Sequence, residues 1–290
     1  MANLDHLQSQ PRRSCLPRGS RTGSAQTKNL SRGFEQTILS NLKLGRADLG
    51  IDYFKNLYQS NPEAITQYFT ALVSAQQIDD AIDVAKLHYK ENGDAESATL
   101  FVSGLNRLGE TSLRDEHAQI VDQILMSHPN DLELLENIAT LRLQHEDPEG
   151  AVAIFNRILK VDPLRIRTLN NMAMTLAELP GRTGEALTSV DRALNLAGEN
   201  PELLDTKGFV LMKSGDLAGA EVIFRQAFDA TQEPRFQFHE IMSLLAQEKK
   251  EQAEKSFQTL DVERLNPAGL TLAERKQLET LKQDFQGSSQ

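Results

Sequence analysis

The chain has 290 residues, a formal net charge of −10, a single cysteine, no tryptophan and 6% aromatic residues. One cysteine cannot form an intrachain disulfide, so a small secreted fold built on disulfides is excluded. The low aromatic content is unusual for a large β-sandwich and ordinary for a helical protein.

The first 30 residues differ in composition from the rest of the chain. They hold five basic residues against one acidic residue, which leaves a net charge of −14 on residues 31–290. They are rich in Pro, Gly and Ser and poor in apolar residues, so they cannot bury enough surface to offset the entropy lost on ordering. We therefore expect residues 1–30 to form a disordered basic tail that includes Cys15, an incidental thiol.

No targeting or membrane segment is expected. Arg12 and Arg13 are followed by no apolar run of the length that an export signal needs, and no stretch approaches 18 consecutive apolar residues. We expect a cytoplasmic protein with no membrane partner. The acidic remainder of the chain lacks the clustered Lys and Arg that nucleic-acid binding requires, so no nucleic-acid partner is expected either.

From residue 50 onward, a small residue followed four positions later by an apolar residue recurs along the chain. The best pairs are Ala151/Phe155, Ala186/Val190, Ala220/Phe224 and Ala253/Phe257, and the register extends backwards to the weaker pairs His117/Val121, Ala81/Ala85 and Gly50/Phe54. The four best pairs begin 35, 34 and 33 residues apart. A period of this length is typical of a helical repeat array, and the pairs predict about seven units.

Each unit contains two amphipathic helical stretches separated by a short turn. In one of them, Leu135, Ile138 and Ala139 form an apolar stripe, and Asp147 then offers an N-cap with Pro148 at the first helical position. Similar signals are Asn61-Pro62-Glu63, Asp162-Pro163, Asn200-Pro201-Glu202, and Gly45 and Gly215 in turns. Each unit is therefore predicted to be a helix hairpin.

With this pattern the chain resembles the tetratricopeptide repeat (TPR) family, above all in Leu204 to Ala220 and Ala151 to Pro163. The chain departs from the family in having no Trp in the first helix and in its degenerate units at 31–97. The resemblance implies an all-α, right-handed superhelical solenoid of about seven hairpins over residues 31–262. A capping helix is expected within 263–286, opened by the capping box Thr271-Leu272-Ala273-Glu274, and residues 287–290 are expected to be disordered.

The sequence offers no support for catalysis. It contains no phosphate-binding glycine loop, no Gly-x-Ser-x-Gly and no His-Glu-x-x-His, and no two of its six histidines have the spacing of helical metal ligands. His117 takes the place of a small residue in other units, which indicates a packing variant. We expect no enzyme activity, no metal and no cofactor.

In the TPR family, positions 2, 5, 6 and 9 of the first helix of each hairpin line the inner surface. The sixth position is polar in all seven units: Gln36, Gln67, Ser103, Asn137, Asn171, Thr206 and His239. Asn137 and Asn171 lie one repeat apart, and their amides could clamp the backbone of an extended peptide, as in resembling family members. The alternative is that these residues form an ordinary polar solvent face.

The ninth position adds an apolar strip of Met174, Phe209 and Met242, with Phe238 beside it. Exposed apolar side chains are typical of a partner site, although the curvature of the array could bury this strip instead. Four acidic residues flank the strip and favour a basic segment: Glu133, Glu136, Glu202 and Asp205. Their sign excludes the clamp with which chaperone-binding relatives hold acidic tails.

These patterns predict a non-catalytic protein-interaction scaffold that binds an extended or helical peptide of basic character in its concave groove. Two rivals stay open: a substrate-recruiting or regulatory arm of a larger enzyme or assembly, and an RNA-reading helical repeat. The oligomeric state cannot be inferred from these patterns.

Overall fold

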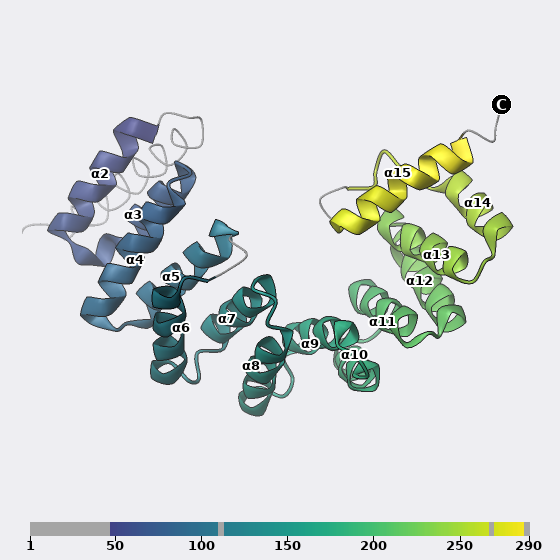
Figure 1. The fold of residues 1–290 in the computed structure, drawn as a ribbon, viewed down its shortest axis with the longest axis horizontal. Helices are drawn as coiled ribbons and strands as arrows, with labels where there is room; N and C mark the ends of the chain where they lie inside the picture. Colours follow the sequence, from purple (N-terminus) through teal and green to yellow (C-terminus); the bar gives the residue numbers. More distant parts are fainter. Residues whose placement is uncertain (1–46, 110–112, 267–269, 287–290) are drawn as a thin grey trace, which may run out of the picture. The chain divides into compact units, whose positions relative to one another are not determined.

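The computed structural model describes residues 47–109, 113–266 and 270–286, drawn in Figure 1. The chain divides into two compact units, residues 1–77 and residues 78–290, and each is described by itself. The expected tail at 1–30, Gln36, Gly45 and residues 287–290 lie outside the described residues. The domain boundaries given above therefore stay predictions.

The described part of the first unit is a helix pair. It consists of α2 (Ala47–Ser60), the 3₁₀-helix η1 (Pro62–Ala64) and α3 (Ile65–Ser74). Asn61 caps η1 through its side chain, as its Asn-Pro signal predicts. Phe54 of the recurring pair is fully buried, and the rings of Tyr58 and Tyr68 stack 5.7 Å apart to join α2 to α3.

The second unit consists of consecutive α-helices, most of which are joined by short turns (Figure 1). They are α4 (Ile78–Asn92), α5 (Ala95–Leu108), α6 (Asp115–Ser127), α7 (Leu132–Gln144), α8 (Pro148–Val161), α9 (Ile166–Glu178), α10 (Thr183–Ala197), α11 (Pro201–Ser214), α12 (Leu217–Thr231), α13 (Pro234–Ala246), α14 (Lys250–Thr259) and α15 (Leu272–Gln286). The predicted all-α solenoid of helix pairs is confirmed. None of the described helices combines the length and the apolar character needed to cross a membrane.

The helix ends follow the predicted stop and start signals. Asp147 caps α8 by accepting a hydrogen bond of 2.9 Å from the Gly150 amide, with Pro148 as the first helical residue. Asn200 caps α11 in the same way before Pro201. Gly215 ends α11 at φ 88°, a left-handed conformation that favours glycine. Local chemistry therefore fixes where each hairpin turns.

The recurring small residues lie where two helices approach closely. Ala151, Ala186, Ala220 and Ala253 are all fully buried. On the partner helix α11, a Cβ added to Gly208 would lie 2.5 Å from the Phe224 ring of α12. Since real Cβ atoms do not approach a ring so closely, glycine at this position is what lets α11 and α12 pack. The burial of the four alanines is consistent with the small residues being placed between packed helices.

The final helix covers the last hairpin. Leu278, Leu281 and Phe285 of α15 join the cluster formed by α13 and α14, which contains Phe238 and Phe257. The capping box is present as predicted: the Thr271 amide donates to Glu274 at 2.7 Å, and the Glu274 amide donates to Thr271 Oγ1 at 3.3 Å. An apolar face that would otherwise end the array in solvent is thereby buried.

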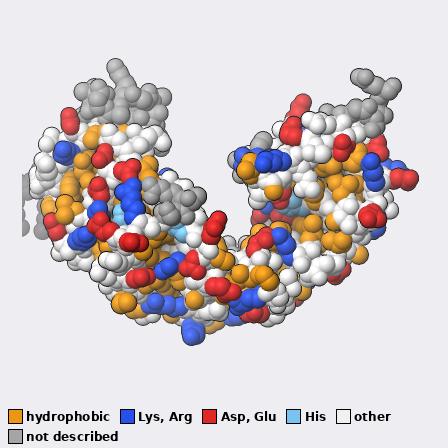
Figure 2. Space-filling view, in the orientation of Figure 1, with side chains coloured by type: hydrophobic (Ala, Val, Ile, Leu, Met, Phe, Trp, Pro, Cys, Tyr) orange, Lys and Arg blue, Asp and Glu red, His pale blue; other side chains and the backbone are white. Residues whose placement is uncertain are grey.

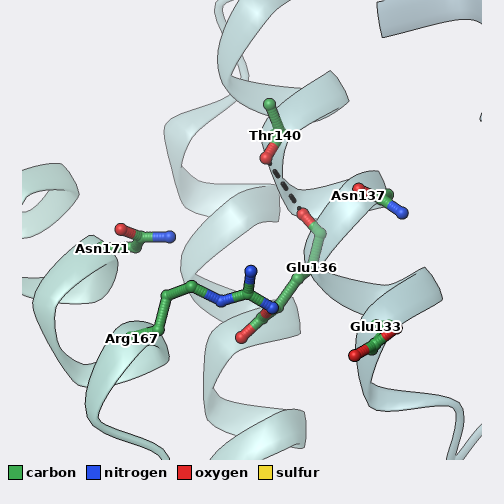
Figure 3. A pocket seen from close by; sticks show the side chains of 6 residues that line it. All are labelled: Glu133, Glu136, Asn137, Thr140, Arg167 and Asn171. Carbon is green, nitrogen blue, oxygen red and sulfur yellow. Dashed lines mark hydrogen bonds and ion pairs between the residues drawn. The ribbon is translucent and has the colours of Figure 1, made fainter. Parts of the chain in front are cut away.

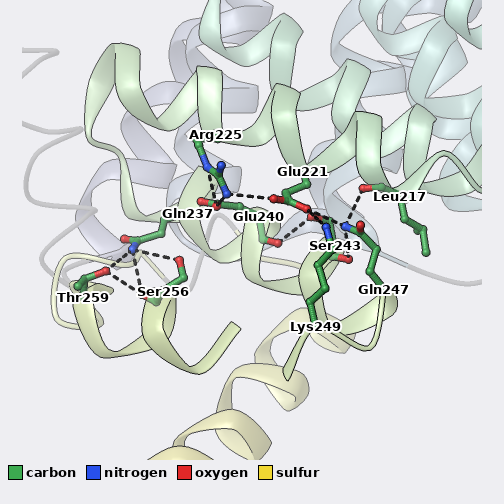
Figure 4. Close-up of polar contacts among 10 residues, drawn as sticks. All are labelled: Leu217, Glu221, Arg225, Gln237, Glu240, Ser243, Gln247, Lys249, Ser256 and Thr259. Carbon is green, nitrogen blue, oxygen red and sulfur yellow. Dashed lines mark hydrogen bonds and ion pairs between the residues drawn. The ribbon is translucent and has the colours of Figure 1, made fainter. Parts of the chain in front are cut away.

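A polar network connects α12 and α13 beside this cluster (Figure 4). Arg225 donates to Glu240 at 2.6 Å and to Glu221 at 3.1 Å, and Lys249 lies 2.8 Å from Glu221. Burial opposes ionisation of Glu221, but the hydrogen bonds from Lys249 and Gln247 outweigh it and hold the pKa of Glu221 below its ordinary value. The network is satisfied within the chain, so its role is to join consecutive hairpins.

Candidate functional site

Two adjoining depressions lie along the first helices of successive hairpins, and they meet on α9. The first, which we call the asparagine pocket, has a volume of about 210 Å³ (Figure 3). It is lined by Glu133, Glu136, Asn137, Thr140, Arg167 and Asn171. Four of these six residues are predicted site residues: three lie on α7, and the fourth, Asn171 of α9, comes 34 residues after Asn137 in the sequence.

Glu136 is the charged centre of the asparagine pocket. Its buried carboxylate accepts hydrogen bonds from Arg165 at 2.8 Å and from Thr168 at 2.5 Å, and it also pairs with Arg167. Burial opposes ionisation, but the hydrogen bonds and the arginine charges outweigh it and hold the pKa of Glu136 below its ordinary value. The negative charge expected here is thus compensated inside the chain.

The two asparagine amides of this pocket have no hydrogen-bond partner among the described residues. Both side chains are half-buried, so they are held near the helix surface but are accessible. The backbone carbonyl of Asn137 accepts a 3.0 Å hydrogen bond from Asn106 of α5, which fixes this turn of α7. Each free amide offers two donors and one acceptor, the groups that pair with a peptide backbone.

The second depression, which we call the anchor groove, has a volume of about 550 Å³. Its walls come from α9, α11, α13 and the start of α15, and its lining is Asn170, Met174, Glu178, Glu202, Asp205, Thr206, Phe209, Lys213, Arg235, His239, Thr271, Ala273 and Glu274. Met174 is 38% exposed and Phe209 is half-buried, so the apolar strip is open to solvent in this groove. The carboxamide oxygen of Asn170 is buried there without a partner among the described residues.

An ionic network forms one wall of the anchor groove. Arg235 of α13 lies 2.6 Å from Glu202 and 3.0 Å from Asp205, both of α11. His239 connects three helices, because its Nδ1 lies 2.5 Å from Asp205 and its Nε2 lies 3.3 Å from Glu274 of α15. The His239 ring also packs against the ring of Phe224, with centroids 5.4 Å apart.

The network changes the pKa values of His239 and of Glu274, the two residues that connect α13 to α15. Burial disfavours the charged imidazole, but hydrogen bonds and charges from Asp205 and Glu274 outweigh it and raise the pKa of His239 to about 9. The contact with His239 and the capping hydrogen bonds from Thr271 lower the pKa of Glu274 to about 2. At neutral pH, His239 is therefore a cation held between two carboxylates, and its side chain is only 16% exposed.

The structure places the predicted site residues as follows. Besides the four in the asparagine pocket, Met174, Glu202, Asp205, Thr206, Phe209 and His239 line the anchor groove, and Met242 lines a smaller cavity beside it. Phe238 requires a correction. It was expected beside an exposed strip, but it is fully buried between α13, α14 and α15, where it belongs to the core.

The expected acidic flank also requires a correction. Glu136, Glu202 and Asp205 all pair with arginines of the next hairpin, and acidic and basic side chains are interspersed on the face shown in Figure 2. The pairing has a register that sequence analysis missed. A carboxylate at position 5 meets an arginine at position 2 of the following first helix, as in Glu136 with Arg167 and Asp205 with Arg235.

His117 has the packing role that its position predicts. It is 3% exposed, and its ring meets Phe101 edge-on with centroids 5.6 Å apart. Burial, and after it the charges of Lys86 and Arg114, lower the pKa of His117. Among the described residues no group of three His, Cys, Asp or Glu side chains is placed to hold a metal ion.

These features define a helical-repeat protein. The helix pairs recur with a period near 34 residues, small residues are buried within the pairs, and the first helices of successive pairs line two depressions. No family model matches the chain. Among curated proteins, "TPR repeat-containing protein PA4667" of Pseudomonas aeruginosa is 26% identical over 176 residues, which cover 61% of this chain and 29% of that protein. The chain therefore has a fold of the tetratricopeptide repeat type and is similar in sequence to this repeat protein, although the match spans less than a third of that relative's length.

Solved structures with the same fold have low sequence identity. A tetratricopeptide repeat protein from Parabacteroides merdae has a TM-score of 0.60 at 16% identity, over 85% of this chain and 98% of that one. PilW, a type IV pilus biogenesis factor, has a TM-score of 0.57 at 16% identity, over 74% and 97%. YrrB, described as a TPR protein with an unusual peptide-binding site, has a TM-score of 0.50 at 14% identity, over 67% and 97%.

Proposed function

We propose that the protein is a non-catalytic interaction scaffold that binds an extended peptide segment of a protein partner along α7, α9 and α11. The observation that carries this proposal is the pair of free amides, Asn137 and Asn171, in the asparagine pocket. They occupy the same register position in consecutive repeats, and the anchor groove with its exposed Met174 and Phe209 continues from α9.

The physical basis of the proposal is that the two depressions would bind different parts of the peptide. Amide side chains pair with backbone N–H and C=O groups, so the asparagine pocket would hold a peptide of many sequences. The anchor groove would supply affinity, because burying an apolar side chain contributes about 1.5–3 kcal/mol. A TPR fold favours a protein partner, and the description of YrrB as a peptide-binding TPR protein supports the same use of this fold.

A displayed library of random ten-residue peptides tests the proposal, with the full chain as bait. Peptides selected by the wild type should bind Asn171→Ala roughly tenfold more weakly, because a lost hydrogen bond in a buried complex costs about 1–3 kcal/mol. Asn156→Ala is the matched control, since Asn156 is an exposed asparagine on α8, away from both depressions. Equal binding by both variants, or the failure of any peptide to be enriched, would contradict the proposal.

A second candidate is a recruiting arm of a larger protein. The matched relative is much longer than the matched segment, which covers only 29% of it. In that case the same groove would hold a segment of a substrate or subunit on behalf of a separate part of the assembly. Binding of the library peptides would be unchanged, and a stable complex of fixed composition on purification with the chain as bait would favour this candidate.

A further inference from the structure

Beneath the first turns of α15 lies a small cavity, which we call the side pocket. It has a volume of about 120 Å³ and is lined by Phe209, Met212, Phe224, His239, Met242, Glu274 and Gln277. Its floor is the apolar surface of α11, α12 and α13. An apolar cavity of about 150 Å³ binds a molecule the size of benzene, so this volume suits one side chain.

The side pocket adjoins the anchor groove. Phe209, His239 and Glu274 line both, so they form the boundary between the two spaces. A peptide backbone lying in the anchor groove can therefore direct one side chain past Phe209 toward Met242.

The side of the side pocket formed by α15, its roof, is polar, whereas the contact of α15 with α13 and α14 is apolar. Leu278, Leu281 and Phe285 of α15 are buried in the cluster with α13 and α14. Over the side pocket, in contrast, α15 presents Glu274 and the exposed Gln277. Among the described residues, none from α15 gives the apolar floor an apolar partner at that place.

Each carboxylate that lines the two spaces is already paired with a cation of the chain. Glu274 and Asp205 both face the His239 cation, and Glu202 faces Arg235. On the opposite wall, Lys213 lies 2.7 Å from Glu178 and 5.2 Å from the centre of the Phe209 ring. A lysine or arginine from a partner would have to compete with these cations for carboxylates that are already paired, whereas an uncharged side chain would leave the pairs intact.

We propose that the side pocket is the specificity site of the scaffold and takes one uncharged apolar side chain, such as Leu, Ile, Met or Phe, from the bound peptide. This proposal rests on the proposed function. The sequence favoured a partner of basic character, whereas the side pocket favours a partner segment that inserts a neutral, apolar side chain.

The test uses the same library of random ten-residue peptides on the wild type, Gln277→Leu and Gln283→Leu. Leucine at 277 fills the side pocket from its roof, whereas Gln283 is an exposed residue of α15 outside the pocket and serves as the matched control. The wild type and Gln283→Leu should enrich Leu, Ile, Met or Phe at least tenfold at one peptide position, without enrichment of Lys or Arg. Gln277→Leu should lose this preference while still binding peptides.

Each other outcome overturns the proposal in a distinguishable way. If the wild type enriches no peptide, the proposed function fails and the side pocket fails with it. If peptides are enriched for Lys or Arg, or without an apolar position, the scaffold function stands and the specificity site is refuted. The same holds if Gln277→Leu keeps the apolar preference.

A second measurement uses the wild-type chain, so it does not require that a substituted chain folds. With methyl-labelled methionine, a peptide selected by the wild type should shift the methyl signals of Met212 and Met242, while the exposed Met126 of α6 should stay unchanged. A bound peptide that leaves Met212 and Met242 unshifted would place its anchor elsewhere and overturn the proposal.

Discussion

Replacing His239 should remove a pH-dependent part of the stability of the C-terminal hairpins. In the folded chain the pKa of His239 is about 9, against an ordinary value of 6.5. A group whose pKa is raised on folding contributes stability fully below its unfolded pKa and loses it as the pH rises through the folded pKa. The His239 contribution is therefore nearly complete at pH 6, declines from about pH 7 and is gone by pH 10.

The size of the effect follows from the two pKa values. The difference between the folded and the ordinary pKa of His239 corresponds to about 3 kcal/mol of stability, of which roughly 2.5 kcal/mol should be lost between pH 7 and pH 10. Glu274 acts at the other end of the scale. Its pKa is lowered from 4.5 to about 2, so its contribution is complete above about pH 4.5 and is lost only as the pH falls toward 2.

The assay is urea unfolding at one-unit steps from pH 6 to pH 10, followed by helical circular dichroism. The stability difference between the wild type and His239→Gln should shrink across this range, because glutamine does not titrate. Asn156→Ala, which replaces an exposed residue of α8 that has no titratable side chain, is the control and should change stability by the same amount at every pH. If the wild-type and His239→Gln curves run parallel from pH 7 to pH 10, the assigned cation between two carboxylates is refuted.

Three further predictions concern packing, pairing and the tail. Gly208→Ala should destabilise the chain by about 1–3 kcal/mol in urea unfolding, because the added Cβ would meet the facing phenylalanine ring. Gly184→Ala is the control and should not destabilise the chain, because the space around Gly184 is open. Equal effects of the two substitutions would contradict the close packing at Gly208. Arg225→Met should cost about 1–3 kcal/mol by leaving the buried Glu240 without its cation, and no change in the urea midpoint would show that the pair contributes nothing. Deleting residues 1–30 should leave the helical signal and melting temperature unchanged, and a clear fall in melting temperature would show that the tail packs on the array.

Much of the fold could be predicted because its determinants are local. Three signals each act within one hairpin: the small residues at a period near 34, the Asp-Pro or Asn-Pro at a helix start, and the glycine at a turn. Asp147, Asn200 and Gly215 therefore mark helix ends in the sequence even when the packing of the other hairpins is unknown. The register then places Asn137 and Asn171 on one face, since helix geometry repeats from unit to unit.

The missed features depend on contacts between hairpins. Arg167 and Arg235 reach back to carboxylates of the preceding repeat, and that reach depends on the offset between neighbouring helices, which the sequence of one unit does not contain. Phe238 occupies position 5, which is also buried at Glu136 and Asp205 of earlier hairpins, and α14 and α15 cover it in the last hairpin.

The central claim is that a peptide lies along the asparagine pocket and the anchor groove. The most direct measurement is the side-chain amide NMR spectrum of the full chain, with the signals assigned by Asn→Ala substitution, on addition of a peptide selected by the wild type. The signals of Asn137 and Asn171 should shift together at the peptide concentration that saturates binding, while that of Asn156 should not move. A saturating peptide that leaves Asn137 and Asn171 unchanged would contradict the claim.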